Sequence, residues 1–260
     1  MRIARFTTGE DPRFGIVEGE VAGSEEIAVI TGDPLYTPIQ FTGERVELAD
    51  VRLLAPVIPR SKVVGIGRNY AEHAKEMGND VPTEPLVFLK PNTSVIGPGD
   101  PIQLPPESSE VHYEGELAVV IGRICRDVPA ERVSEVVLGY TVANDVSARD
   151  FQKKDGQWWR AKGSDTFCPL GPYLVTGIDA SDLRVVTRRD GEVVQDGRTS
   201  QMIFDIPTLV AFVSSAMTLL PGDVLLTGTP AGVGPIVEGQ RVEVEIEGIG
   251  TLSNPVVRRR

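Results

Sequence analysis

The sequence predicts an α+β protein in which strands dominate and helices are few. Short segments of alternating apolar and polar residues recur along the chain, with the two-residue period of a half-buried strand. The 260 residues include 27 glycines and 20 prolines, which separate these segments by turns. Segments with a helical period are short and scattered, so we expect helices to be a minor part of the fold.

Residues 1–56 are predicted to form a small β-rich N-terminal domain. The segments 2–8 (RIARFTT) and 14–22 (FGIVEGEVA) alternate as strands do, and a turn-rich stretch without a helical period follows them. Residues 55–60 (APVIPR) contain two prolines that favour extended backbone, which indicates a connector. The remainder, residues 57–260, is predicted to be the larger domain.

The larger domain is expected to mix strands with short helices. Residues 70–77 (YAEHAKEM) predict a helix that has Asn69 as its N-cap and ends at Gly78. A second helix is expected to start at Ser147 as its cap. Further short helices are predicted at 130–137 and over most of 206–222. Strands are predicted at 62–66, 85–90, 116–124, 137–144, 185–188, 223–226 and 241–246, with a hairpin turn at Asp190-Gly191.

Charge and composition exclude several classes of partner. The net charge of −11 argues against nucleic acid or an anionic membrane as a partner. The longest uncharged run, residues 206–222, is shorter than the ~20 residues that span a bilayer. The N-terminus lacks the pattern of a signal peptide. Cys125 and Cys168 form no C-x-x-C motif and are expected to be core residues. We therefore expect a cytoplasmic protein.

Glu114 and Glu116 form the most informative pair in the chain. They open the apolar run at 117–121, and on a strand their two-residue spacing directs both carboxylates to one side of the sheet. Like charges held that close are tolerated if a cation lies between them or if one carboxylate keeps a proton. Oxygen ligands of this kind suit Mg²⁺ or Mn²⁺. The alternative is two glutamates on a solvated strand face.

Histidine is rare in this chain, and His73 lies in the predicted helix at 70–77. Glu76 follows three residues later and is therefore beside it on the helix surface. A carboxylate next to an imidazole fixes its tautomer and raises its basicity, as a general base requires. The alternative is an exposed ion pair without a role.

Further polar candidates lie downstream. Asp145 ends an apolar strand, and a glycine-rich loop begins at Gly228-Thr229, where backbone N–H groups can approach an anion. Arg149, Gln152 and Lys162 lie in a polar stretch that begins as a helix. Each of them, taken alone, is also compatible with an ordinary surface position.

Seven segments between about Lys62 and Pro255 together resemble the fumarylacetoacetate hydrolase superfamily, in its acylpyruvase, oxaloacetate decarboxylase and 2-hydroxyhepta-2,4-diene-1,7-dioate isomerase branch. They are, in order, GRNYAEHAKEM, FLKP, HYEGELAVVIG, ANDVSARDFQ, AKGSDTFCPLGP, SQMIFDIPTLV and LLTGTPAGVGP. The resemblance implies a mixed β-roll, usually a homodimer. The first 55 residues resemble the small extra domain of some bacterial members.

The resemblance also implies roles for individual residues. It implies a divalent-metal site, Mg²⁺ or Mn²⁺, with Glu114, Glu116 and Asp145 as ligands. It implies His73 and Glu76 as a catalytic pair with Lys162, and substrate binding by Arg149, Gln152, Gly228 and Thr229. The founding enzyme has a fourth acidic ligand where this chain has Ile66, so three protein ligands are expected here and fumarylacetoacetate is a doubtful substrate.

These roles lead to the hypothesis of a metal-dependent enzyme that acts on 2-oxo (1,3-diketo) acids through a metal-bound enolate. Hydrolytic C–C cleavage of an acylpyruvate-type substrate is the favoured reaction. Isomerisation of 2-hydroxyhepta-2,4-diene-1,7-dioate and decarboxylation of oxaloacetate stay open, because all three reactions share the enolate. A non-catalytic metal-binding paralogue is disfavoured, since both the acidic triad and the His–Glu pair are intact.

Overall fold

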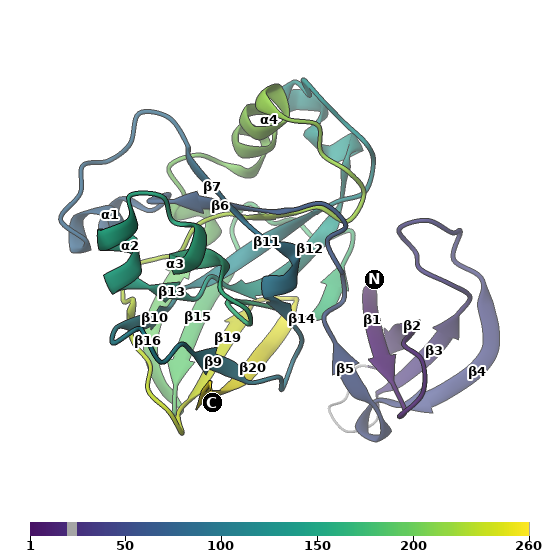
Figure 1. Cartoon of the computed structure of the whole chain (residues 1–260). Helices are drawn as coiled ribbons and strands as arrows, with labels where there is room; N and C mark the ends of the chain where they lie inside the picture. The colour runs from purple at the N-terminus through teal and green to yellow at the C-terminus, as the bar shows by residue number, and fades with distance from the viewer. Residues whose placement is uncertain (20–24, 260) are drawn as a thin grey trace.

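The computed structural model describes residues 1–19 and 25–259 and is shown in Figure 1. Within these residues, strands form three sheets. The largest contains β1 (Arg2–Thr7), β2 (Arg13–Glu18), β3 (Glu26–Ile30), β4 (Phe41–Glu47), β5 (Arg52–Leu54), β6 (Val63–Gly67), β7 (Leu86–Lys90), β8 (Val95–Ile96), β11 (Gly115–Ile121), β12 (Val137–Asn144), β14 (Cys168–Val175) and β17 (Val224–Leu226).

Two smaller sheets accompany the large one. The first contains β9 (Ile102–Leu104), β15 (Arg184–Arg189), β16 (Glu192–Arg198), β19 (Arg241–Ile246) and β20 (Gly250–Arg258). The second contains β10 (Val111–Tyr113), β13 (Ser147–Ala148) and β18 (Gly234–Pro235). The α-helices are α1 (Ala71–Glu76), α2 (Arg149–Asp155), α3 (Trp159–Gly163) and α4 (Ile206–Ala216), and 3₁₀ turns occur at Leu48–Asp50, Asn92–Ser94, Ala130–Glu135 and Thr199–Gln201.

The main path of the large sheet has the order β4-β3-β2-β1-β14-β12-β11-β17-β6-β7. Most neighbours are antiparallel, but β17 pairs with β6 in parallel, and so do β14 with β8 and β20 with β9. The sheets are therefore mixed, as predicted. In Figure 1, α1, α2 and α3 gather near β10 and β13, whereas α4 lies apart from them.

Strand β11 is buried on both of its faces, which explains its uninterrupted apolar run. Leu117, Val119 and Ile121 pack into one hydrophobic core, together with residues of β15 and β19. Ala118 and Val120 point to the opposite side and pack into a second core. A strand covered on both sides has no solvent-facing positions, so its sequence loses the usual alternation.

The N-terminal strands continue the large sheet, because β1 pairs with β14 in antiparallel orientation. The predicted strands at 2–8 and 14–22 correspond to β1 and β2, although residues 20–24 lie outside the described part. The stretch that we expected to be rich in turns also contains β3 and β4, two strands that were not predicted individually. The division of the chain into domains 1–56 and 57–260 stays a prediction.

Most predicted elements of the larger domain are present, and Cys125 and Cys168 are buried thiols as expected. The hairpin turn is also confirmed, since Asp190 and Gly191 have φ values of 52° and 84° between β15 and β16. The predicted helix at 130–137 is instead a 3₁₀ helix, and strand 116–124 ends at Ile121.

Both predicted helix caps were wrong, because the two side chains have other partners. Helix α1 begins after Tyr70, and the Asn69 amide instead donates to the carbonyls of Phe204 and Thr227 and accepts from the Phe204 N–H. Ser147 lies in β13 and donates to the carbonyl of Asp145. Asn69 thus ties the segment before α1 to the loop after β17.

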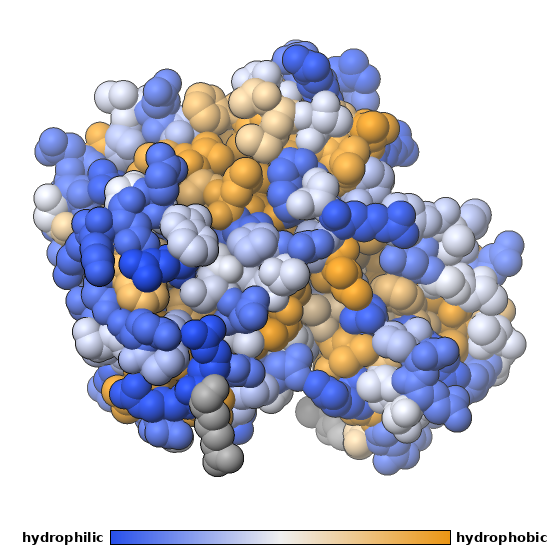
Figure 2. All heavy atoms as spheres, in the orientation of Figure 1, coloured by the Kyte–Doolittle hydropathy of each residue, from blue (hydrophilic) through white to orange (hydrophobic). Residues whose placement is uncertain are grey.

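Polar side chains cover most of the face shown in Figure 2, and apolar side chains gather below α4 and beside the junction with β1–β5. Apolar surface of this kind is often buried between subunits. The homodimer nevertheless stays a prediction. Within the described ranges, no helix combines the length and apolar character that crossing a membrane requires.

The fold gives a first testable prediction. Asn69→Ala removes three hydrogen bonds of a buried side chain and leaves their backbone partners without it, so we expect a loss of about 2–4 kcal/mol in the free energy of unfolding. Thermal and urea unfolding measure it. Asn92→Ala is the control, because Asn92 is exposed. Equal stabilities of the two variants would show that Asn69 does not fasten this segment.

Candidate active site

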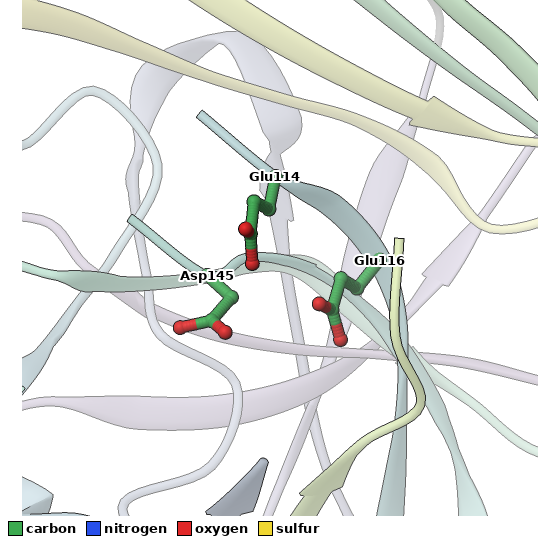
Figure 3. A group of neighbouring side chains, drawn as sticks. All are labelled: Glu114, Glu116 and Asp145. Carbon is green, nitrogen blue, oxygen red and sulfur yellow. The ribbon is translucent and has the colours of Figure 1, made fainter. Parts of the chain in front are cut away.

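Three buried carboxylates converge where β11 meets β12 (Figure 3). One oxygen from each of Glu114, Glu116 and Asp145 lies within 4.8 Å of the other two. The register of the sheet explains this, since Gly115 pairs with Asn144 and places Glu114 beside Asp145. Glu114 occupies the one-residue break between β10 and β11, and the Asp145 N–H donates to its carbonyl at 2.8 Å.

Three basic side chains from separate elements neutralise this cluster. Lys162 of α3 donates to one oxygen each of Glu114 and Asp145, both at 2.6 Å. Arg149, at the start of α2, donates to the other Glu114 oxygen, and Lys90 of β7 to the other Asp145 oxygen. These lysine and arginine side chains are at most 3% exposed.

The three acids differ in how well they are paired. Burial raises the pKa of Glu114, but the charges of Lys162 and Arg149 outweigh it and hold that pKa below its ordinary value. Burial raises the pKa of Glu116 well above its ordinary value, and the charges of Asp145 and Glu114 add to the effect. Glu116 has no basic partner within 1–19 and 25–259; its contact is the Gly228 N–H at 2.7 Å.

This arrangement fits a hard divalent cation. The available donors are carboxylate oxygens, which Mg²⁺ and Mn²⁺ prefer. A cation among them would also offset the burial and the repulsion that raise the pKa of Glu116. The three residues Glu114, Glu116 and Asp145 would hold it, and other positions would remain for water or substrate.

His73 of the histidine–glutamate pair lines the same cavity as Glu114 and Glu116. His73 of α1 is 7% exposed, and its Nδ1 lies 3.3 Å from a Glu76 oxygen. The Gly232 N–H donates to both oxygens of Glu76 at 3.1 Å. Glu76 therefore connects the imidazole to the loop after β17, and a carboxylate at Nδ1 leaves Nε2 as the nitrogen that can accept a proton.

A cavity of about 290 Å³ is lined by His73 and by Glu114 and Glu116 of the cluster. Its wall contains the following polar and apolar side chains: Ile66, Arg68, His73, Met77, Asn79, Glu114, Glu116, Arg149, Gln152, Lys153, Trp158, Lys162 and Thr229. The Thr229 hydroxyl is already engaged, since it donates to the Gly115 carbonyl and accepts from Gln195. Gln152 accepts from Arg149 at 2.9 Å.

Seven of the ten residues that the sequence singled out line this cavity, and the other three contact lining residues: Glu76 contacts His73, Asp145 contacts Lys162, and Gly228 contacts Glu116. It also places Lys90 at the cluster, a residue that we had treated only as part of a strand. The sequence contained a signal that Lys90 is not an ordinary surface lysine. Lys90 is on the same strand face as Phe88 and directly precedes Pro91, and this position is unusual for an exposed lysine. Arg68, Met77, Asn79 and Trp158 were also not anticipated as wall residues.

Comparison with known proteins identifies the family. Residues 62–257 match the family described as fumarylacetoacetate (FAA) hydrolase, C-terminal. This chain belongs to the fumarylacetoacetate hydrolase family. Residues 1–56 match a second description, Rv2993c-like, N-terminal. The predicted family, its β-dominated fold and an enzymatic role are thereby confirmed.

Three relatives illustrate the range of the family. The crystal structure named 5-carboxymethyl-2-hydroxymuconate delta-isomerase from Mycobacterium smegmatis is 54% identical, with a TM-score of 0.93 and complete coverage of both chains. Rat mitochondrial oxaloacetate tautomerase Fahd2a is 42% identical over 99% of this chain and 92% of its own. Maleylpyruvate hydrolase from Sphingobium sp. SYK-6, in complex with manganese(II) and pyruvate, is 34% identical, with a TM-score of 0.81 and complete coverage of both chains. Enzymes of this family use a divalent metal.

The raised pKa of Glu116 gives a second prediction. An acid whose pKa rises on folding costs stability as the pH increases from its unfolded pKa through its folded pKa. In metal-free protein, Glu116→Gln removes this cost at neutral pH, and we expect the melting temperature to rise by about 3–10 °C. The same variant should lose the stabilisation that added Mg²⁺ or Mn²⁺ gives the parent protein.

Differential scanning calorimetry at pH 5 and pH 8, with and without metal, measures both effects. Glu107→Gln is the control, since it removes a carboxylate that is exposed, whereas those of the cluster are buried. A variant at position 116 that melts below the parent without metal, or that is still stabilised by metal, would contradict the prediction.

Proposed function

We propose that this enzyme binds Mg²⁺ or Mn²⁺ at Glu114, Glu116 and Asp145 and catalyses proton transfer at the carbon next to the carbonyl of a 2-oxo acid. The reaction class is tautomerisation or isomerisation. The observation that carries the proposal is that His73, paired with Glu76, lines the same cavity as Glu114 and Glu116 of the acidic cluster. The names of two relatives, an oxaloacetate tautomerase and a delta-isomerase, support it.

The metal would supply a Lewis acid that stabilises negative charge on the 2-oxo oxygen. The other contributions come from the chain itself. His73 takes the proton from carbon and returns it at the same or another carbon. Glu76 orients the imidazole and offsets the positive charge it acquires. Lys162 lies at the cluster and adds a fixed positive charge near the oxygen where negative charge develops.

The substrate carboxylate has several donors within reach of the cluster. Arg149 and Gln152 hold each other at 2.9 Å in the cavity wall, which fixes the guanidinium. The Gly228 N–H already donates to Glu116 and the Thr229 hydroxyl to Gly115, so this loop can contribute only other backbone N–H groups. Fixed donors of this kind orient a substrate without reorganisation.

Hydrolytic C–C cleavage of an acylpyruvate-type substrate is the second candidate. It is favoured by the likeness to maleylpyruvate hydrolase, whose structure contains manganese and pyruvate. In this reaction His73 takes a proton from water, and the hydroxide attacks the distal carbonyl. The C–C bond then breaks to release a carboxylic acid and the enolate of pyruvate, which takes up the proton from His73. Cytoplasmic location and a homodimer remain part of the proposal.

Replacing the imidazole tests the proposal. His73→Gln preserves shape but removes the proton acceptor, so we expect the enol–keto exchange of oxaloacetate, followed by ultraviolet absorbance, to slow about 10²–10⁴-fold. Glu76→Gln should cause a smaller loss, because the imidazole remains. Decarboxylation of oxaloacetate, which needs no proton acceptor at this position, should largely survive in both variants.

Lys75→Gln is the control for this series, since Lys75 is exposed on the same helix. Pyruvate release from acetylpyruvate, measured in parallel, separates the hydrolase from the tautomerase. Exchange by His73→Gln at the parent rate would refute the role of the imidazole.

A further inference from the structure

Arg68 lies in the cavity wall. Within the described ranges, no carboxylate pairs with its positive charge. It is half-buried and, within these residues, makes no hydrogen bond or ion pair. The other basic side chains of the wall each contact a carboxylate: Arg149 that of Glu114, Lys162 those of Glu114 and Asp145, and Lys153 that of Glu110. A half-buried guanidinium without a partner is costly, unless a ligand supplies the missing charge.

The backbone holds Arg68 in an unfavourable conformation. Its φ is 57°, the left-handed region, which costs a non-glycine residue about 1–2 kcal/mol. Both neighbours are tightly packed: a Cβ on Gly67 would lie 3.3 Å from Trp158, and the buried Asn69 side chain makes three hydrogen bonds. Glycine would satisfy the same backbone at lower cost. Such strain is typically retained at binding sites.

A guanidinium in this position matches a particular chemistry. Arginine binds carboxylates through paired N–H donors, and partial burial strengthens the interaction. The acidic cluster with its cations takes the 2-oxo end of a substrate, so Arg68 is available to a second anionic group farther along the molecule. Trp158 and Met77 provide apolar wall for the carbons between the two ends.

We propose that Arg68 is a specificity-determining residue of this site, which binds the second carboxylate when the substrate is a 2-oxo dicarboxylic acid. This inference rests on the proposed function, because the 2-oxo end is placed at the acidic cluster.

Binding of two unreactive ligands tests this inference on the full chain loaded with Mn²⁺. Malate and lactate share a 2-hydroxy acid end and differ in the second carboxylate. By calorimetry, the parent enzyme should bind malate more tightly than lactate. Arg68→Gln should lower the ratio of the two affinities about 10- to 100-fold, as expected for the loss of a charged hydrogen-bonded pair. The ratio of kcat/KM for oxaloacetate to that for acetylpyruvate should fall in the same direction.

Two further variants separate recognition from folding and from net charge. Arg68→Gly relieves the left-handed strain, so it should melt no lower than the parent and yet lose the preference for malate. Lys154→Gln removes one exposed positive charge outside the cavity wall and should keep the preference.

Each remaining outcome overturns the inference. Equal weakening of malate and lactate would assign Arg68 a purely structural role, and an unchanged ratio would assign it none. A parent enzyme that binds both ligands but does not prefer malate would leave the proposed function intact and refute the second carboxylate. A Mn²⁺-loaded parent that binds neither ligand would refute the proposed function, and this inference with it.

Discussion

The rest of the site depends on the repulsion among three carboxylates that the fold holds within 4.8 Å of one another inside the protein. Buried like charges of this kind are stable only if cations compensate them. Lys162, Arg149 and Lys90 supply that compensation from α3, α2 and β7. The short helices at this end of the sheet are thus positioned by electrostatics as well as by packing.

The sheet makes this cluster possible because β11 is buried on both faces. Its apolar residues belong to two different cores, so the strand is rigid up to its first residues, where the carboxylates begin. On the opposite side, Glu76 joins helix α1 to the loop after β17 through Gly232. His73 and the loop that holds Glu116 through Gly228 are therefore parts of one connected structure.

The sequence was informative where function follows from local spacing. The two-residue interval of Glu114 and Glu116 and the three-residue interval of His73 and Glu76 correctly predicted neighbours in space. Contacts over long sequence separations were not predictable in this way. Lys90 reaches Asp145 across 55 residues, and Asn69 reaches Phe204 across 135. The latter contact also explains the wrong helix cap, since a tertiary partner outcompeted the local one.

The N-terminal strands also depend on long-range contacts that the sequence pattern does not reveal. Residues 41–47 of β4 are mostly exposed and carry little apolar periodicity, so only their pairing with β3 makes them a strand. Propensity and pattern describe a residue's own surroundings, whereas pairing depends on a partner elsewhere in the chain.

Charge balance connects the chemistry to the choice of substrate. The three acids of the cluster match three basic side chains, so a divalent cation would leave two positive charges in excess. The carboxylate of a 2-oxo acid and the negative charge that develops on its 2-oxo oxygen balance those two. Arg68 stands outside this balance, and its charge requires a third negative group on the ligand. Residues of the cluster therefore determine which reaction is possible, and one arginine at the end of β6 determines which 2-oxo acid is bound well.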